Sequence, residues 1–441
     1  MKATMIPVRF PSGNPEKFNK ILDELKKIYL DEVEFLEPVM LGDKLPEADG
    51  LLLPNMEADV YIKWETLLEA NMPIVVITTE CGVSLMFDWE SVAYLKNKGA
   101  EVYNPFSVEL AKTIFKAIAL KREMIGKKFL MFQDIPGDDS LLPDIFRVFY
   151  WWNEECSRDI KTRFGVEIVR KPLKALGEKA KKISDKAARE ELKRWDIPYH
   201  DVSEAALLAS IKFFIALRDE VESEGDVAAI GTNCLNEAYN SDTTPCLAYN
   251  LLYQEKGVMW GLESDSSALM TQYLFGSTID STIFATNIYP FLSGMPALSH
   301  EKIRSFPDVD DPDNHALLVH CGYLGCSLCQ KGATRWILKP PVLDWLVGEN
   351  STVIDADVEL GPITMCKLHG DFQKVQLQPA TLKEYVQYPG SDCRNGGLIH
   401  IADGYRMMEK ICSHHVIVMT GKRENQIRAV ASVFKLEIDK I

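Results

Sequence analysis

Short apolar runs alternate with amphipathic stretches over the first 120 or so residues of the chain. The run PIVVIT, residues 73–78, is nearly all apolar, as a parallel strand covered on both faces would be. Residues 15–28 place four apolar side chains on one stripe at helical spacing. Strands and helices in alternation predict right-handed βαβ units in a doubly wound sheet. The predicted elements are strands at 4–9, 50–53 and 73–78, and helices at 15–28, 59–70, 89–98 and 107–121.

The alternation starts again at residue 127, after the basic segment KREMIGKK, and this predicts a domain boundary near residue 125. Beyond about residue 300, short strand-like runs separated by Gly and Pro turns replace it, which indicates a sheet or a small barrel. The predicted fold class is therefore α/β, with two Rossmann-like doubly wound domains, 1–125 and 126–300, followed by a β-rich, barrel-like domain, 301–441. The later predicted elements are helices at 142–164, 171–195, 204–222 and 425–434, and strands at 166–170, 226–231, 316–320, 351–356, 361–367, 374–379 and 415–420.

Composition narrows the class of protein. The 441 residues include 49 Lys and Arg against 64 Asp and Glu, a formal net charge of −15, which argues against a protein that binds nucleic-acid phosphates. No apolar run reaches the ~18 residues of a membrane span, and the start of the chain has no apolar signal-peptide core. The ten cysteines are scattered, as reduced thiols would be. We expect a cytoplasmic protein with no nucleic-acid or membrane partner.

Three separated segments carry the candidate chemistry. The first, GLESDSSALMTQYLFG, places Glu263 and Asp265 at the start of a helix, where α/β sheets collect ligands, although an Asp before Ser-Ser is more often a helix N-cap. The second, NHALLVHCG, ends a strand at His320. The third, CSHHVIVMTG, opens a strand with His414 and His415, whose side chains point to opposite faces, so at most one of them enters a given site. Together the segments supply a carboxylate and two imidazoles, a set suited to a divalent metal such as Mn²⁺.

These segments resemble the L-fucose isomerase and L-arabinose isomerase superfamily. GLESD with its helix is similar to the family's metal-carboxylate segment, NHALLVHCG to its strand with a metal-binding His, and HHVIVMTG to its C-terminal double-His segment. The order and approximate spacings match from about residue 225 to 440. The resemblance implies a carbohydrate isomerase, an intramolecular oxidoreductase that uses Mn²⁺ or another divalent metal to interconvert aldoses and ketoses through an ene-diol. It also implies a small-molecule sugar substrate and a homo-oligomer, a trimer or hexamer.

Residue by residue, the resemblance makes Glu263 a metal ligand and catalytic carboxylate, and His320 and His415 the imidazole ligands. The family places a second carboxylate some two dozen residues after the first, and Asn287 best fits that position here, with Asp280 as the fallback. Asn287 is thus both a catalytic and a metal-ligand candidate, but an amide oxygen binds a divalent ion more weakly and cannot act as a base. The acid partner could then be Asp265, a metal-bound water or another residue.

Other features keep alternatives open. The spacing C-x4-C-x2-C of Cys321, Cys326 and Cys329 suits an iron–sulfur cluster or structural zinc. Asp88 and Trp89 follow the third predicted strand and could meet a sugar, as could His414, or the loop could be ordinary with Trp89 packed in the core. Because Asn287 replaces a carboxylate, a sugar- or metabolite-binding homologue without isomerase activity and a metal-dependent lyase on the same scaffold are the rival functions.

Overall fold

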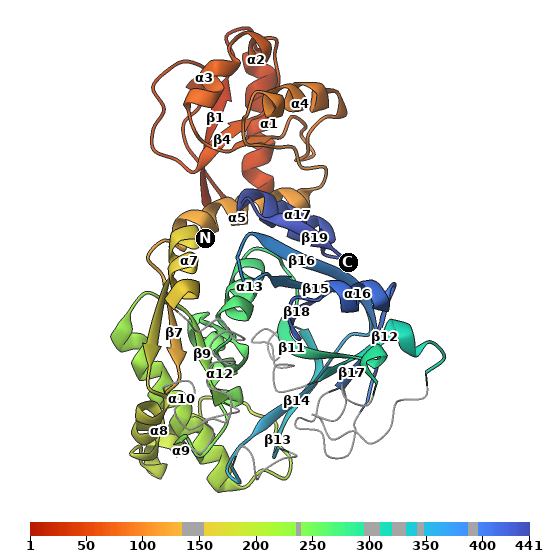
Figure 1. Ribbon diagram of the computed structural model, residues 1–441. Coiled ribbons are helices and arrows are strands. Elements are labelled where there is room, and N and C mark those ends of the chain that lie inside the picture. The colour runs from red at the N-terminus through yellow and green to blue at the C-terminus, as the bar shows by residue number, and fades with distance from the viewer. Residues whose placement is uncertain (135–153, 235–239, 295–308, 320–331, 342–347, 387–395) are drawn as a thin grey trace. The chain divides into compact units, whose positions relative to one another are not determined.

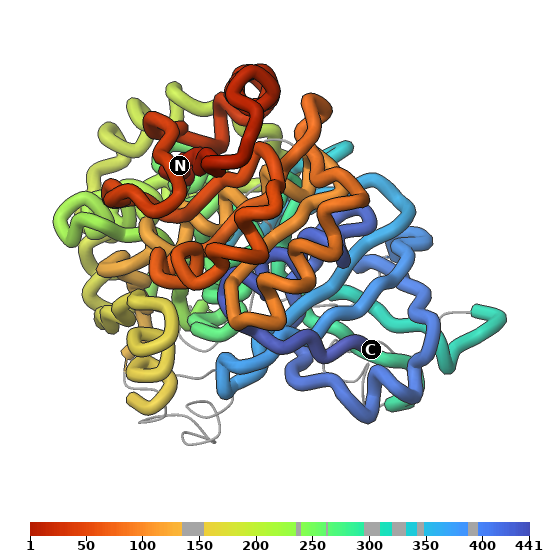
Figure 2. The backbone as a smooth tube through the Cα atoms, turned by 90° about the horizontal axis from the view of Figure 1, so that it is seen from above, coloured from red at the N-terminus to blue at the C-terminus, as the bar shows by residue number. Residues whose placement is uncertain are grey.

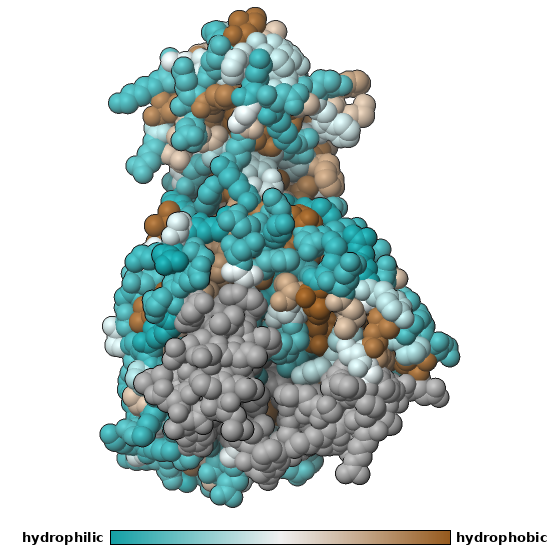
Figure 3. All heavy atoms as spheres, in the orientation of Figure 1, coloured by the Kyte–Doolittle hydropathy of each residue, from teal (hydrophilic) through white to brown (hydrophobic). Residues whose placement is uncertain are grey.

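The computed structural model describes residues 1–134, 154–234, 240–294, 309–319, 332–341, 348–386 and 396–441, which are coloured in Figures 1 and 2. The chain divides into two units. Unit 1 comprises Met1–Ile125, Ser277–Ile279 and Asn425–Lys435, and unit 2 comprises Gly126–Gly276, Asp280–Glu424 and Leu436–Ile441. The segments predicted as the second and third domains thus belong for the most part to one unit. Hydrophilic residues dominate the visible surface, with separate hydrophobic patches (Figure 3).

Unit 1 is built on a parallel sheet with the strand order β2-β1-β4-β5-β6, while β3 also pairs with β1. Its core consists of the apolar residues of these strands packed against the helices, including the stripe of α1 that the sequence predicts. The strands are β1 (Ala3–Arg9), β2 (Val33–Phe35), β3 (Val39–Met40), β4 (Gly50–Leu53), β5 (Ile74–Val76) and β6 (Val102–Tyr103), and the helices are α1 (Pro15–Ile28), α2 (Asp59–Ile62), α3 (Trp64–Glu69), α4 (Trp89–Asn97), α5 (Val108–Glu123) and α17 (Glu424–Val433).

Unit 2 contains a second parallel sheet with the order β10-β9-β7-β8. The predicted helix at 171–195 is two helices, because Ser184 caps a new helix with its side chain on the amide of Ala187. The Rossmann-like form of the two parallel sheets stays a prediction. The strands are β7 (Lys128–Phe132), β8 (Glu167–Lys171), β9 (Val227–Thr232) and β10 (Met259–Gly261), and the helices are α7 (Glu154–Phe164), α8 (Leu173–Lys181), α9 (Asp185–Leu192), α10 (Glu204–Glu224), α12 (Cys246–Lys256) and α13 (Ser266–Gly276).

The rest of unit 2 confirms the prediction of a β-rich, barrel-like part. Six antiparallel strands run in the order β15-β18-β11-β12-β17-β16, and pairing of β15 with β16 closes the barrel. One of them, β11, precedes residue 300 and therefore falls outside the predicted domain 301–441. The strands are β11 (Ile283–Pro290), β12 (His315–Val319), β15 (Gly361–Leu368), β16 (Lys374–Tyr385), β17 (Gly396–Ile401) and β18 (His415–Thr420), with β19 (Glu437–Lys440) added to β16, the hairpin β13 (Ala333–Lys339) and β14 (Val353–Val358), and helix α16 (Gly404–Lys410).

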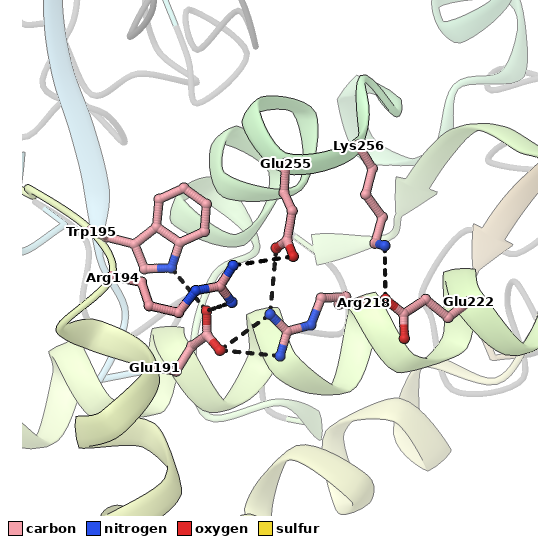
Figure 4. A network of polar contacts seen from close by, with 7 residues as sticks. All are labelled: Glu191, Arg194, Trp195, Arg218, Glu222, Glu255 and Lys256. Carbon is pink, nitrogen blue, oxygen red and sulfur yellow. Dashed lines mark hydrogen bonds and ion pairs between the residues drawn. The ribbon is translucent and has the colours of Figure 1, made fainter.

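A charged network joins three helices of unit 2 (Figure 4). Glu191 of α9, 9% exposed, accepts hydrogen bonds from the side chains of Arg194 and Trp195 at 2.8 and 3.0 Å, and from Arg218 of α10 at 3.1 Å. Arg218 also lies 3.4 Å from Glu255 of α12. Burial opposes ionisation of Glu191, but the hydrogen bond from Trp195 and the charge and hydrogen bonds of the two arginines outweigh it and lower the pKa of Glu191 below its ordinary 4.5.

We expect Glu191→Gln to lower the free energy of unfolding by about 1–3 kcal/mol at neutral pH, because it weakens the hydrogen bonds to both arginines. A lowered pKa in the folded state contributes stability above the unfolded pKa, and this is lost as the pH falls through the folded pKa. Urea unfolding should therefore show a difference from the wild type that shrinks below the ordinary pKa of 4.5. Glu190→Gln, at an exposed neighbour on α9, is the control. Equal stabilities of Glu191→Gln and wild type at neutral pH would contradict the expectation.

Candidate functional site

The antiparallel register of the barrel brings two of the predicted site residues together. Asn287 of β11 pairs directly with His415 of β18, and on its other side with Val319, the last residue of β12. Directly paired residues lie on the same face of a sheet. Because Ile288 and Val416 belong to the barrel's core cluster, Asn287 and His415 lie on the opposite face. Both are buried, at 3% and 1% exposure. His320, the residue after Val319, lies outside the described residues, so its ligand role stays a prediction.

Glu263 lies where the second parallel sheet ends. It belongs to a short 3₁₀ turn, Leu262–Ser264, directly after β10, and its side chain is buried at 2% exposure. Glu263 has φ 48° and Ser264 φ 60°, the left-handed region that residues other than glycine rarely adopt. Two consecutive residues of this kind cost free energy, and such strain gathers at functional sites. The turn places the carboxylate of Glu263 at the carboxyl edge of the sheet, where α/β proteins bind ligands.

Close packing fixes helix α13, which follows this turn. A Cβ atom on Gly261 would lie 2.7 Å from Cβ of Leu269, so only glycine allows α13 to approach β10 this closely. Helix α13 also contacts β15: Ser267 Oγ donates to the carbonyl of Leu368, and the amide of Leu368 donates to Thr271 Oγ1. These hydrogen bonds join the helix to the end of barrel strand β15 and bring the parallel sheet and the barrel to one place within unit 2.

Asp265 connects all of these parts. Its Oδ1 accepts the amide of Ala268 at 2.8 Å, so the predicted N-cap is present. Its Oδ2 accepts Lys367 Nζ at 2.7 Å and His415 Nδ1 at 2.9 Å. Burial raises the pKa of Asp265, but the charge of Lys367 and the hydrogen bond and charge of His415 outweigh burial and lower it to about 2. Both oxygens of Asp265 are thus engaged and the group stays ionised, which argues against its use as the acid partner.

The contact with Asp265 sets the chemistry of His415. An ionised carboxylate only accepts, so the proton of a neutral His415 ring lies on Nδ1 and the lone pair on Nε2. A histidine that binds a metal commonly gives its other ring N–H to a carboxylate in this way. Because Lys367 balances the charge of Asp265, the pair adds little net charge to the neighbourhood of the ring. In the neutral ring, Nε2 of His415 therefore carries the lone pair, and its role as a metal ligand stays a prediction.

The donor set of the site fits a divalent cation. The Oδ1 atom of Asn287 is buried without a hydrogen-bond donor among the described residues, while its Nδ2 donates to Tyr289 at 3.2 Å. A buried amide oxygen, a buried carboxylate and an imidazole Nε2 would be offered by Asn287, Glu263 and His415, and these are atoms that Mn²⁺ accepts. Within the described ranges, no three side chains of His, Cys, Asp or Glu are grouped closely enough to hold a metal ion. A complete set would therefore draw on Asn287 and on His320.

The fallback and the further substrate-binding candidates differ in their surroundings. Asp280 is exposed just before β11, so Asn287 suits the second ligand position better. His414 is partly buried, with its ring centroid 4.3 Å from that of His415. Asp88 and Trp89 belong to unit 1, where Asp88 accepts a hydrogen bond from Thr78 Oγ1 at 2.5 Å. Trp89 is 52% exposed, so the alternative that it packs in the core is wrong.

The cysteine alternative remains a prediction, because Cys321, Cys326 and Cys329 lie outside the described residues. Cys366 is buried on β15, and burial raises the pKa of its thiol. Cys246 is buried on α12, and burial raises its pKa to about 12. Thiols kept protonated in this way are poor metal ligands and poor nucleophiles.

Sequence reasoning missed Lys367. The residue lies near the end of the predicted strand 361–367, where a lysine ordinarily reaches solvent. Its side chain is 1% exposed in the structure, and its partner Asp265 is 102 residues away. A lysine inside an otherwise apolar barrel strand was the available signal, since a buried lysine requires an anion.

Comparisons with known proteins leave the family open. No family model matches the sequence, and no curated protein matches it. Among solved structures, one match is described as "XylFII molecule"; it is 11% identical, covers 64% of this chain and 87% of its own, and has a TM-score of 0.16. A likeness this weak carries no argument about fold or function. In the described part of the chain, no helix has the length and apolar character needed to span a membrane.

Proposed function

We propose that the protein is a divalent-metal-dependent aldose–ketose isomerase that acts on a small sugar through an ene-diol, with Mn²⁺ as the metal. The observation that carries the proposal is the direct pairing of Asn287 with His415, whose ring is held by Asp265 at the start of α13. Asp265 and His415, 150 residues apart in sequence, are thereby in contact beside Asn287. Glu263, two residues before Asp265, adds a buried carboxylate.

Each residue has a part in the proposed reaction. A bound Mn²⁺ would supply Lewis-acid stabilisation of the negative charge that develops on the sugar oxygens. Glu263 accepts the proton from the carbon beside the carbonyl and returns it to the former carbonyl carbon. The proton of the adjacent hydroxyl passes through a bound water to the former carbonyl oxygen, so one C–H and one O–H bond break and one of each forms. His415 and Asn287 offer Nε2 and Oδ1 as ligands, and Asp265 with Lys367 keeps the His415 ring oriented. The burial of these groups excludes water, which protects the ene-diol.

The Asn287 position favours one rival, a sugar-binding protein without isomerase activity. With an amide in place of a second carboxylate, Glu263 is the only anion in the proposed ligand set, and fewer anionic ligands weaken the binding of a hard divalent ion. The same change removes a group that could act as a base. We therefore expect low turnover of simple pentoses and of fucose by the natural chain.

Asn287→Asp tests both the ligand position and the proposed function. We expect tighter Mn²⁺ binding, measured by isothermal titration calorimetry, and faster conversion of aldoses to ketoses, measured on a panel of pentoses and fucose. The rate should rise by ~10²–10⁴ if the new carboxylate transfers the hydroxyl proton, a step that Glu263 does not carry out. Asn250→Asp, at a buried amide of α12, is the matched control. Unchanged Mn²⁺ affinity would place Asn287 outside the ligand set, and tighter metal without turnover would favour the binding protein.

A further inference from the structure

The carboxyl edge of the second parallel sheet carries a buried amide that the proposed reaction does not use. β7 lies next to β9, and β9 next to β10, so the residues that follow these strands meet at one edge. They are Gln133, Asn233 and the turn with Glu263. The amide of Asn233 donates to the carbonyl of Phe132, and Ser264 Oγ lies 3.5 Å from the same oxygen. Gln133 follows β7, which pairs with β9, and β9 pairs with β10, the strand that leads to Glu263.

The side chain of Gln133 is 5% exposed, yet neither its Nε2 nor its Oε1 has a hydrogen-bond partner among the described residues. A buried amide costs free energy when its bonds to water are lost and no described residue replaces them. The next residue shows the contrast: Asp134 Oδ2 accepts the amide of Lys174 and lies 3.3 Å from Asn240 Nδ2. The backbone of Gln133 is satisfied as well, since its amide donates to the carbonyl of Lys171.

The chemistry of this edge selects the ligand. An amide offers donors and an acceptor side by side, and a hydroxyl group both donates and accepts, so the two are complementary. The carboxylate of Glu263 lies in the turn after β10, and its negative charge disfavours a phosphorylated or otherwise anionic ligand. Lys367 and Lys171, two lysines of the neighbouring strands, are already paired, Lys367 with Asp265 and Lys171 with Glu220 and Glu224. A neutral polyol or open-chain sugar is the class that remains.

We propose that Gln133 binds a hydroxyl group of a neutral polyol at the carboxyl edge of the β10-β9-β7-β8 sheet. The proposal rests on the proposed function for the identity of the ligand, because a sugar processed at Glu263 would extend its remaining hydroxyls along this edge. Gln133 would then help to select the sugar. It follows β7, a strand that contributes no residue to the proposed metal centre.

Gln133→Leu tests the proposal with the alditols ribitol, xylitol, L-arabinitol and L-fucitol as probes in calorimetric titrations. We expect the wild type to bind at least one of them and Gln133→Leu to bind it about tenfold more weakly or worse, since a hydroxyl then loses its partner. Gln378→Leu, at an equally buried glutamine of β16 whose Oε1 also lacks a partner among the described residues, should change alditol affinity by less than about twofold. Thermal melting of Gln133→Leu should match or exceed that of the wild type, because the variant no longer buries an amide.

Alditol binding by Gln133→Leu at wild-type affinity, or no alditol binding by the wild type, would overturn the proposal. A melting temperature well below that of the wild type would overturn it too, by assigning Gln133 a structural role. Mn²⁺ titrations separate this proposal from the isomerase. If the protein neither binds Mn²⁺ nor turns over a sugar, but its alditol binding depends on Gln133, the role of Gln133 is supported and the isomerase is rejected. Gln133→Leu should leave the Mn²⁺ affinity unchanged.

Discussion

Asp265→Ala is expected to lower the free energy of unfolding of unit 2 by about 3–5 kcal/mol, the largest effect on stability that we predict. The variant leaves the ammonium of Lys367, 1% exposed, without its carboxylate, and it removes the cap of α13 and the partner of His415 Nδ1. An uncompensated buried charge accounts for most of the loss. Urea unfolding followed by far-ultraviolet circular dichroism measures it, with Asp280→Ala, at an exposed aspartate, as the control.

A double variant separates charge from packing. Replacing both partners, in Asp265→Asn with Lys367→Met, removes the stranded charge, so it should be less destabilising than Asp265→Asn alone. Asp265→Ala within about 0.5 kcal/mol of the wild type would contradict the buried ion pair. A double variant at least as unstable as Asp265→Asn would contradict the explanation by charge.

Glu263→Gln should give the largest effect on activity. It keeps the size of the side chain but removes the proposed base, so turnover of any aldose that the wild type converts should fall by ~10²–10⁴. Mn²⁺ affinity should fall as well, because the variant removes the one anionic ligand of the proposed set. Ketose formation under saturating sugar and Mn²⁺ measures the first effect. Glu359→Gln, at an exposed glutamate of unit 2, should match the wild type. A Glu263→Gln rate equal to that of the wild type would remove Glu263 from the chemistry.

The sequence predicts best where a pattern is local. The apolar run at 415–420 becomes β18 with the same bounds, and the helical stripe at 15–28 becomes α1. The N-cap at Asp265 is a local feature too, and it is present. Such features depend on side chains a few positions apart, so periodicity and capping residues reveal them.

Features that depend on distant pairing could not be predicted in this way. That β11 joins the barrel depends on registers with β12 and β18, and nothing in residues 283–290 specifies those partners. The Lys367–Asp265 pair spans 102 residues, and only the docking of α13 on β15 creates it. Gln133 is likewise an ordinary glutamine in the sequence, and the lack of partners that singles it out appears only when its neighbours are placed.

The most direct test of the proposed metal centre is anomalous diffraction at the manganese edge, from crystals of the full-length wild-type protein grown with MnCl₂. We expect one strong anomalous peak per chain, in contact with the carboxylate of Glu263, Nε2 of His415 and Oδ1 of Asn287. No peak at this position, or a peak only at other residues, would contradict the metal centre and with it the proposed isomerase.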